Sequence, residues 1–492
     1  MTRPSDPGRM ILRGAQATAA GFAGRLGARL LFLFVAGRLF GPAPFGAYVL
    51  AVAAVELAVS VGSLGMKKLV FQLLDGEKDP RALPHVLLGA ALLVALASAA
   101  LAAMLMAAAL LLPPVFLPGG AGKALFLLAP MVAGQSLLDL FLAATRWRHA
   151  IRYEVVARSL VEPYALLLGA AAAWALGWRE TGLLAGYWAG TLAALAFAAA
   201  GARRVFGPFR LGAWRPDPAR LLPTLRFAFS NTAADLLNAL YTRVDLWLVG
   251  LLLGAGPAGV YGMARQVAVP IRQVRQSFDG LLIPLVARTL GRRGSRGSGE
   301  ALASATRLIL AIQLPLIVAL FAVGRPLLAW LGAGFEAAYW PLLALAVAEA
   351  IQAAFSIGDL VFVYLKPKVG LVLTLASIAV GIAAALLLIP PLGLAGAALS
   401  VLAAYALRAA LRSVVLRAHF YLDVPHSHQA GPFAAAAAGI AAVLLAGAWP
   451  LPYRFDPLPL VLGLGLYAAV LALWLQLSRQ SLSLTGFAAE TD

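Results

Sequence analysis

The chain of 492 residues is too apolar for a water-soluble protein, since 62% of its residues are hydrophobic and only 12% are charged. Soluble domains hold about half apolar and about a quarter charged residues, so lipid must be the solvent for much of this surface. The sequence has no cysteine, which excludes disulfides and cysteine-based metal sites. Its net charge of +18 indicates cytoplasmic loops that set membrane topology rather than binding to nucleic acid, because most lysines and arginines lie between apolar runs.

Apolar runs long enough to cross a bilayer recur along the whole sequence and predict an all-α polytopic membrane protein of about fourteen transmembrane helices. The first of these runs contains Arg25 and Arg29 and lacks a small-residue cleavage site, so we expect an uncleaved helix rather than a signal peptide. The predicted helices span residues 14–39, 45–73, 83–112, 122–146, 150–177, 182–203, 220–252, 257–288, 301–330, 338–365, 368–389, 393–418, 432–449 and 457–478.

Basic loops alternate with short, nearly neutral loops along the chain. The positive-inside rule then places both termini in the cytoplasm and requires an even number of helices. The expected segments are a cytoplasmic N-terminus at 1–13, an N-lobe at 14–203, a cytoplasmic linker at 204–219, a C-lobe at 220–418, a cytoplasmic loop at 419–431, helices thirteen and fourteen within 432–478, and a cytoplasmic tail at 479–492.

Three short patterns recur in the same order in the two halves. The matching pairs are Gly41–Tyr48 with Gly254–Tyr261, Asp139-Leu140 with Asp359-Leu360, and Gly182–Gly186 with Gly393–Gly396. They predict two homologous six-helix lobes followed by a hairpin. Because six helices separate the copies, both lie on the same side of the membrane, and the repeat is parallel. Such repeats build transporters whose halves rock around a central site.

Arginines inside the predicted helices are the candidate binding residues, because a charge at membrane depth costs ~2.5–3.5 kcal/mol or more and normally faces a cavity or a partner. Arg25 and Arg29 share one helix face, and Arg265 and Arg272 share another, with Arg275 one turn further on. These basic groups outnumber the nearby acids, which predicts a cationic cavity that selects an anion. Arginine suits phosphate because its planar fork donates two hydrogen bonds.

Three carboxylates, Glu56, Asp235 and Asp245, match these arginines in depth along their helices. One interpretation is structural ion pairing that fixes helix register, which we favour for Arg158 with Glu162. The other is coupling of transport to protons or sodium ions. We find no nucleotide fold, catalytic constellation or metal-ligand spacing in the sequence, and we favour a solvated loop over a metal site for His419, His426 and His428. No cofactor is therefore expected.

The stretch from Arg38 to Tyr48 resembles the early motif of bacterial polysaccharide exporters of the O-antigen flippase type. Arg243–Asp245 followed by Gly259–Tyr261 is similar to the second-half signature of that family, and Leu331–Phe335 to its segment between helices nine and ten. The resemblance covers about residues 14–420, within the multidrug/oligosaccharidyl-lipid/polysaccharide exporter superfamily. It implies a multi-pass protein of the bacterial inner membrane that flips a polyprenyl-pyrophosphate-linked oligosaccharide and is not an enzyme.

We therefore expect a lipid-linked oligosaccharide flippase that works by alternating access, with Arg25, Arg29, Arg265, Arg272 and Arg275 binding the pyrophosphate. Its expected partners are this substrate and the bilayer, with no nucleic acid. A multidrug exporter of the same superfamily is the first alternative, but it would need an acidic cavity for cationic drugs. A membrane-embedded glycan polymerase or glycosyltransferase is the second, but it would need a large outer loop with carboxylates, whereas the outer acids are scattered at Glu180, Glu336 and Asp456.

Overall fold

The computed structural model describes residues 24, 27–208, 218–292, 294–356, 359, 362, 367–420, 429–446 and 456–478. Every regular element among them is helical, which confirms the predicted all-α polytopic fold. The chain divides into two compact units, Met1–Gly259 and Val260–Asp492, and each is described separately.

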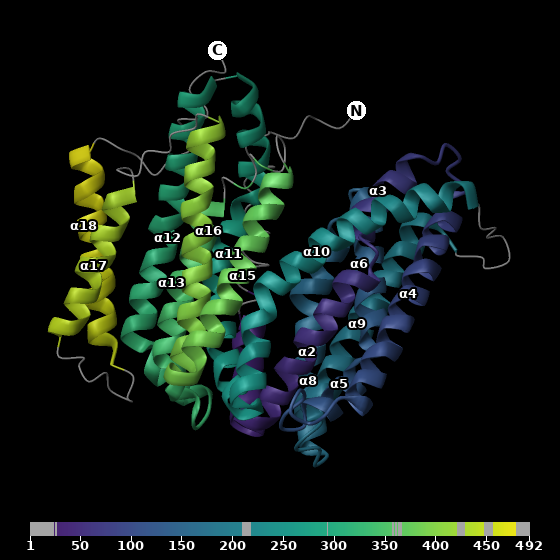
Figure 1. Ribbon diagram of the computed structural model, residues 1–492, viewed down its shortest axis with the longest axis horizontal. Helices are drawn as coiled ribbons and strands as arrows, with labels where there is room; N and C mark the ends of the chain where they lie inside the picture. The colour runs from purple at the N-terminus through teal and green to yellow at the C-terminus, as the bar shows by residue number, and fades with distance from the viewer. Residues whose placement is uncertain are drawn as a thin grey trace, which may run out of the picture. The chain divides into compact units, whose positions relative to one another are not determined.

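The first unit contains a bundle in which α2 packs against α4, α5, α6 and α10, while α9 packs against α6 and α8 (Figure 1). The elements of this unit are η1 (Ala36–Phe40), α2 (Pro42–Gly62), α3 (Met66–Asp75), α4 (Leu83–Leu111), α5 (Ala121–Leu128), α6 (Met131–Trp147), α7 (Arg152–Val156), η2 (Ala157–Val161), α8 (Glu162–Ala175), α9 (Gly182–Phe206) and α10 (Pro218–Leu253).

The second unit is organised around α12 and α16. Helix α12 packs against α13, α17 and α18, and α16 packs against α13 and α15. The last two helices lie side by side as a hairpin, drawn in yellow in Figure 1. The elements, of which α11 begins in the first unit, are α11 (Ala255–Arg292), α12 (Gly294–Leu331), η4 (Phe335–Ala338), α13 (Tyr339–Phe355), α15 (Pro367–Leu392), α16 (Leu394–Phe420), α17 (Ala430–Leu445) and α18 (Pro457–Ser478).

Ten helical segments of the described chain are long and apolar enough to cross a membrane, or eleven if the bent pair α5 and α6 counts as one span. Three of the fourteen predicted helices are not in this set. The first lies largely outside the described residues, α11 carries Arg265, Arg272 and Arg275, and α17 is a shorter apolar helix of 16 residues. The predicted ranges 45–73 and 122–146 each correspond to two helices joined at a break.

Local backbone chemistry explains both breaks. Helix α2 ends where Leu64 and Gly65 adopt the left-handed conformation, with φ of 50° and 61°, and α3 begins directly afterwards. Helices α5 and α6 meet at Pro130 with a bend of 48°. Proline has no N–H to donate to the preceding turn, so it favours a new helix start at this point.

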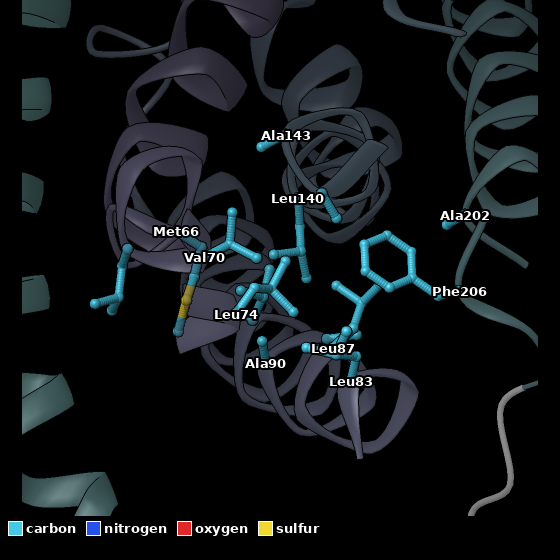
Figure 2. Close-up of a cluster of buried hydrophobic side chains, with 14 residues drawn as sticks. Met66, Val70, Leu74, Leu83, Leu87, Ala90, Leu140, Ala143, Ala202 and Phe206 are labelled. Atoms are coloured by element: carbon cyan, nitrogen blue, oxygen red, sulfur yellow. The ribbon is translucent and has the colours of Figure 1, made fainter. Parts of the chain in front are cut away.

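A buried apolar cluster fixes the end of the first unit that carries α3. Figure 2 shows Met66, Val70 and Leu74 of α3 in one cluster with Leu87 of α4 and Leu140 of α6. All five side chains are buried. Because large apolar side chains fill this space to interior density, α3 is held against the bundle in spite of the break before it.

The two copies of the repeated glycine-proline motif contact each other. A Cβ added at Gly46 would lie 1.7 Å from the carbonyl oxygen of Ala255, and one added at Gly259 would lie 2.0 Å from that of Pro42. Ordinary van der Waals contact needs 3.4–4 Å, so only glycine allows these backbones to approach so closely.

Candidate functional site

A polar network crosses the interior of the first unit. Arg158 donates to Glu162 at 2.7 Å and is also paired with Asp139, whose second oxygen lies 2.8 Å from the Lys67 ammonium. Gln135 donates to both Glu162 and Thr191, at 3.1 and 3.0 Å. The expected pair of Arg158 and Glu162 is confirmed. Two basic and two acidic groups balance, which is the pattern of a structural network.

A π-helical turn places Arg158 in this network. Pro163 cannot donate to Ser159 four residues back, and the Glu162 N–H instead bonds to the carbonyl of Ala157, five residues back. The wider turn of η2 brings Arg158 toward α6 and Glu162 onto the same face. Such π-bulges often occur at functional sites.

Two further ion pairs tie α2 and α3 to α10. Glu56 pairs with Arg243, and the Lys68 ammonium lies 3.2 Å from Asp235. Two of the three predicted coupling carboxylates therefore have basic partners within the first unit. The third, Asp245, is only 4% exposed and also has an interaction partner.

Arg272 of α11 is paired with Glu349 of α13 in the second unit. Its guanidinium lies 3.3 Å from Glu349 Oε1, which is longer than the ~2.7–2.9 Å of a strong charge-assisted hydrogen bond. The Glu349 side chain is 6% exposed, and its other oxygen finds no hydrogen-bond donor among the described residues. The nearby backbone is fixed, since Gln313 donates to the carbonyl of Ile271 at 2.7 Å. This buried carboxylate is thus only half satisfied.

A tighter cluster lies at Asp359 in the same unit. Arg412 donates to both Asp359 oxygens, at 2.7 and 2.9 Å, and Arg408 adds a bond of 3.3 Å. The Arg412 side chain is only 2% exposed and lies within α16. Its charge is therefore neutralised in a buried fork-to-fork pair, which makes it a structural residue.

The predicted anion-binding arginines are distributed as follows. Arg25 lies outside the described residues, and Arg29 is partly buried near the start of the described chain. Arg265, Arg272 and Arg275 project from α11 and are all partly buried. Of these, Arg272 has a defined carboxylate partner, and the others also have partners.

Sequence reasoning missed Glu349, Gln135 and Thr191 as members of polar networks. Glu349 is flanked by apolar residues on both sides within the predicted helix 338–365, and a charge in such surroundings was the available signal. Gln135 and Thr191 are uncharged and give no such signal. Asp139 and Asp359 were found only as parts of the internal repeat, although each is the centre of an ion-pair cluster.

No group of three or more potential ligands among the described residues has the geometry to hold a metal ion. The arrangement offers arginines in partly buried positions, each able to donate two parallel hydrogen bonds to an anion. His426 and His428 lie outside the described residues, as does the side chain of His419.

Comparison with known proteins gives one family match and one curated relative. The family described as "Polysaccharide biosynthesis protein" matches residues 35–334, more than half of the chain. The succinoglycan biosynthesis transport protein ExoT of Rhizobium meliloti is 24% identical over 335 residues, covering 65% of this chain and 62% of that protein. The chain thus spans somewhat less than two thirds of the length of this relative.

Two solved structures share the fold. The lipid II flippase MurJ, in an inward closed conformation, aligns over 94% of this chain and 100% of its own with a TM-score of 0.76 at 13% identity. An inward-facing multidrug resistance transporter of the MATE family aligns over 83% and 98% with a TM-score of 0.67 at 11% identity. At such identities the likeness establishes the fold alone. Together with the apolar helices, the matches identify a multi-pass protein of the bacterial inner membrane.

Proposed function

We propose that this chain, which belongs to the polysaccharide biosynthesis protein family, is a flippase for a polyprenyl-pyrophosphate-linked oligosaccharide. The family match supports a glycan substrate, and the fold shared with a lipid II flippase supports movement of a lipid-linked one. Such a protein moves its substrate across the membrane by alternating access through a cationic cavity. It neither forms nor breaks a covalent bond in the substrate.

The pairing of Arg272 with Glu349 is the observation that carries this proposal. The Glu349 carboxylate occupies the position that a phosphate oxygen would take in front of the Arg272 guanidinium. The distance between the guanidinium nitrogen and Glu349 Oε1 is long, at 3.3 Å. A pyrophosphate has more charge and more acceptor oxygens than one carboxylate, so it displaces Glu349 from Arg272. Arg25, Arg29, Arg265 and Arg275 complete the proposed binding set.

The displaced carboxylate must then be neutralised, because an isolated ionised carboxylate in a buried site is costly. Uptake of a cation at Glu349 when substrate binds would supply that neutralisation. We retain Glu56, Asp235 and Asp245 as further candidates for coupling to protons or sodium ions. The basic partners of Glu56 and Asp235 would make coupling at these two carboxylates an exchange of ion pairs.

The test replaces Arg272 with glutamine in the full-length protein. We expect uptake of a fluorescent polyprenyl-pyrophosphate oligosaccharide by proteoliposomes to fall about 10- to 100-fold, since a charged hydrogen bond contributes about 1.5–3 kcal/mol. Arg272→Lys keeps the charge but loses the fork, and should be intermediate. Arg152→Gln makes the same change at an exposed position of α7 and should flip normally.

Elution as a single species from size exclusion and an unchanged helical circular dichroism spectrum establish that each variant is folded. If folded Arg272→Gln flips at the rate of the wild type, the assignment of this arginine is wrong. If the wild-type protein moves none of several lipid-linked glycans, the proposed function is wrong.

A multidrug exporter is the second candidate because a multidrug transporter shares the fold. The excess of basic side chains in the proposed site opposes it, since cationic drugs need acidic surroundings. Expression in a drug-sensitive host is the discriminating measurement. Resistance to cationic drugs that is lost in Glu349→Gln and kept in Arg272→Gln would favour the exporter.

A further inference from the structure

A hollow lies at the predicted outer end of the first unit, and none of the proposed pyrophosphate ligands is among its lining residues. Two adjoining cavities, of about 790 and 300 Å³, share Lys123, Glu180, Thr181 and Leu184 as lining residues. The larger one opens beside Trp178 and Trp188, and the smaller one reaches Tyr48 of α2. Both volumes fall within the ~300–1,000 Å³ of small-molecule sites.

Aromatic side chains line the larger cavity. Trp188 donates its indole N–H to the carbonyl of Leu127 at 2.9 Å, which sets the orientation of its ring. Trp178, in the loop between α8 and α9, is 54% exposed. The electron-rich faces of such rings attract weakly positive C–H groups, which cover one side of a pyranose ring.

The polar groups of the hollow are both donors and acceptors. The Lys123 ammonium lies 3.4 Å from Glu180, with side chains 63% and 80% exposed. An exposed ion pair of this kind is weak, so both groups can exchange to a ligand at small cost. An ammonium donates to sugar hydroxyls, and a carboxylate accepts from them.

The charge pattern favours a saccharide over a lipid phosphate. Glu180 borders both cavities and would repel an anionic head group. Arg179 does not provide an open cationic site in compensation, because its guanidinium stacks 3.9 Å from the ring centroid of Trp174. A tryptophan at the membrane interface usually acts only as a bilayer anchor. Here, however, the two tryptophan rings border a cavity that also contains the ion pair of Lys123 and Glu180.

We propose that this hollow, bordered by Lys123, Trp178, Glu180 and Trp188, is a saccharide-binding site that holds sugar units of the translocated glycan on the outer side. The inference rests on the proposed function for the identity of the glycan. The site lies apart from Arg272 in the chain and recognises sugar rings instead of pyrophosphate, so the two are separable by experiment.

The experiment measures binding of the purified full-length protein in detergent to an array of lipid-free oligosaccharides, both neutral and uronic-acid-containing. We expect binding to a subset of them that becomes at least about tenfold weaker in Trp178→Ala and Glu180→Ala. Glu180→Gln keeps hydrogen bonding and should recover part of the affinity. Trp340→Ala removes a tryptophan with the same 54% exposure outside the hollow and should bind normally.

Absence of binding to every oligosaccharide, or equal binding by wild type and both hollow variants, would overturn the saccharide site. Weaker association of the hollow variants with phosphatidylglycerol vesicles, with unchanged glycan binding, would assign the hollow to lipid head groups and also overturn it. Arg272→Gln should retain array binding while losing translocation. Array binding by a wild-type protein that moves no lipid-linked glycan would instead refute only the flippase.

Discussion

The intramembrane arginines differ in how firmly a carboxylate holds them. Arg412 makes two short bonds to Asp359 and is almost fully buried, whereas Arg272 makes one long bond to a half-satisfied Glu349. A bidentate buried pair resists exchange, because its separation would leave two uncompensated charges. The loosely held pair can exchange partners. Under the proposed function, this distinction separates arginines that hold the fold from those that would bind a substrate.

The stability of the Asp359 cluster can be measured with a matched pair of variants. Asp359→Asn removes the carboxylate charge that Arg412 and Arg408 share, so we expect the free energy of unfolding to fall by about 3–5 kcal/mol. Asp235→Asn makes the same change in a more exposed pair with Lys68 and should cost less than about 1 kcal/mol. Thermal unfolding in detergent compares the two, and equal losses would show that Asp359 holds no special ion pair.

Spacing along one helix predicts an ion pair here, whereas depth matching between helices does not give the partners that Glu56 and Asp235 have in the structure, which are Arg243 and Lys68. Arg158 and Glu162 were predictable because they lie one turn apart on a single helix. Their link to Asp139 was not, since it depends on the rotation of α6 about its axis and on the π-turn at η2. Counting residues gives height in the membrane but not direction around the helix. Glu349 was missed as a partner of Arg272 for the same reason.

At the scale of elements, the hydropathy of the chain predicts where helices occur but not where they bend. Each predicted range after the first overlaps at least one described helical element, and the first lies largely outside the described residues. The breaks at Gly65 and Pro130 were not predicted, because the apolar run continues through Pro130 and because Gly65 lies inside the predicted range 45–73. A bend depends on one residue's backbone, whereas a hydropathy pattern averages over a whole turn or more.

The contact between the repeated motifs predicts a sharp contrast among three glycines. Gly46→Ala and Gly259→Ala place a methyl group within 1.7 and 2.0 Å of backbone oxygens, so the helices must separate. Such overpacking costs about 1–3 kcal/mol. Gly256→Ala adds the same methyl group where nothing lies within 4 Å and should be neutral. Thermal unfolding in detergent tests this, and three equal melting temperatures would contradict the close approach.

At the scale of the whole molecule, the distribution of charge among the loops predicts the orientation in the membrane. The loop between α3 and α4 carries Lys78 and Arg81, while residues 112–120 between α4 and α5 carry no charge. The positive-inside rule places the first loop in the cytoplasm and the second outside. This orientation decides which side the saccharide hollow faces, because Lys123 follows the neutral loop by three residues.

The cysteine-free sequence allows a direct test of this orientation with single cysteines. Helix α4 has 29 residues and therefore spans ~44 Å, more than the ~30 Å hydrocarbon core, so its two ends must lie on opposite sides. Val115, which is 70% exposed, and Lys78, which is also exposed, lie beyond these ends. We expect a membrane-impermeant maleimide to label Val115→Cys from outside in spheroplasts, and Lys78→Cys only in inverted vesicles. The wild-type protein is the unlabelled control. Labelling of Lys78→Cys alone from outside would reverse the topology and place the hollow in the cytoplasm, where it would meet the glycan before translocation.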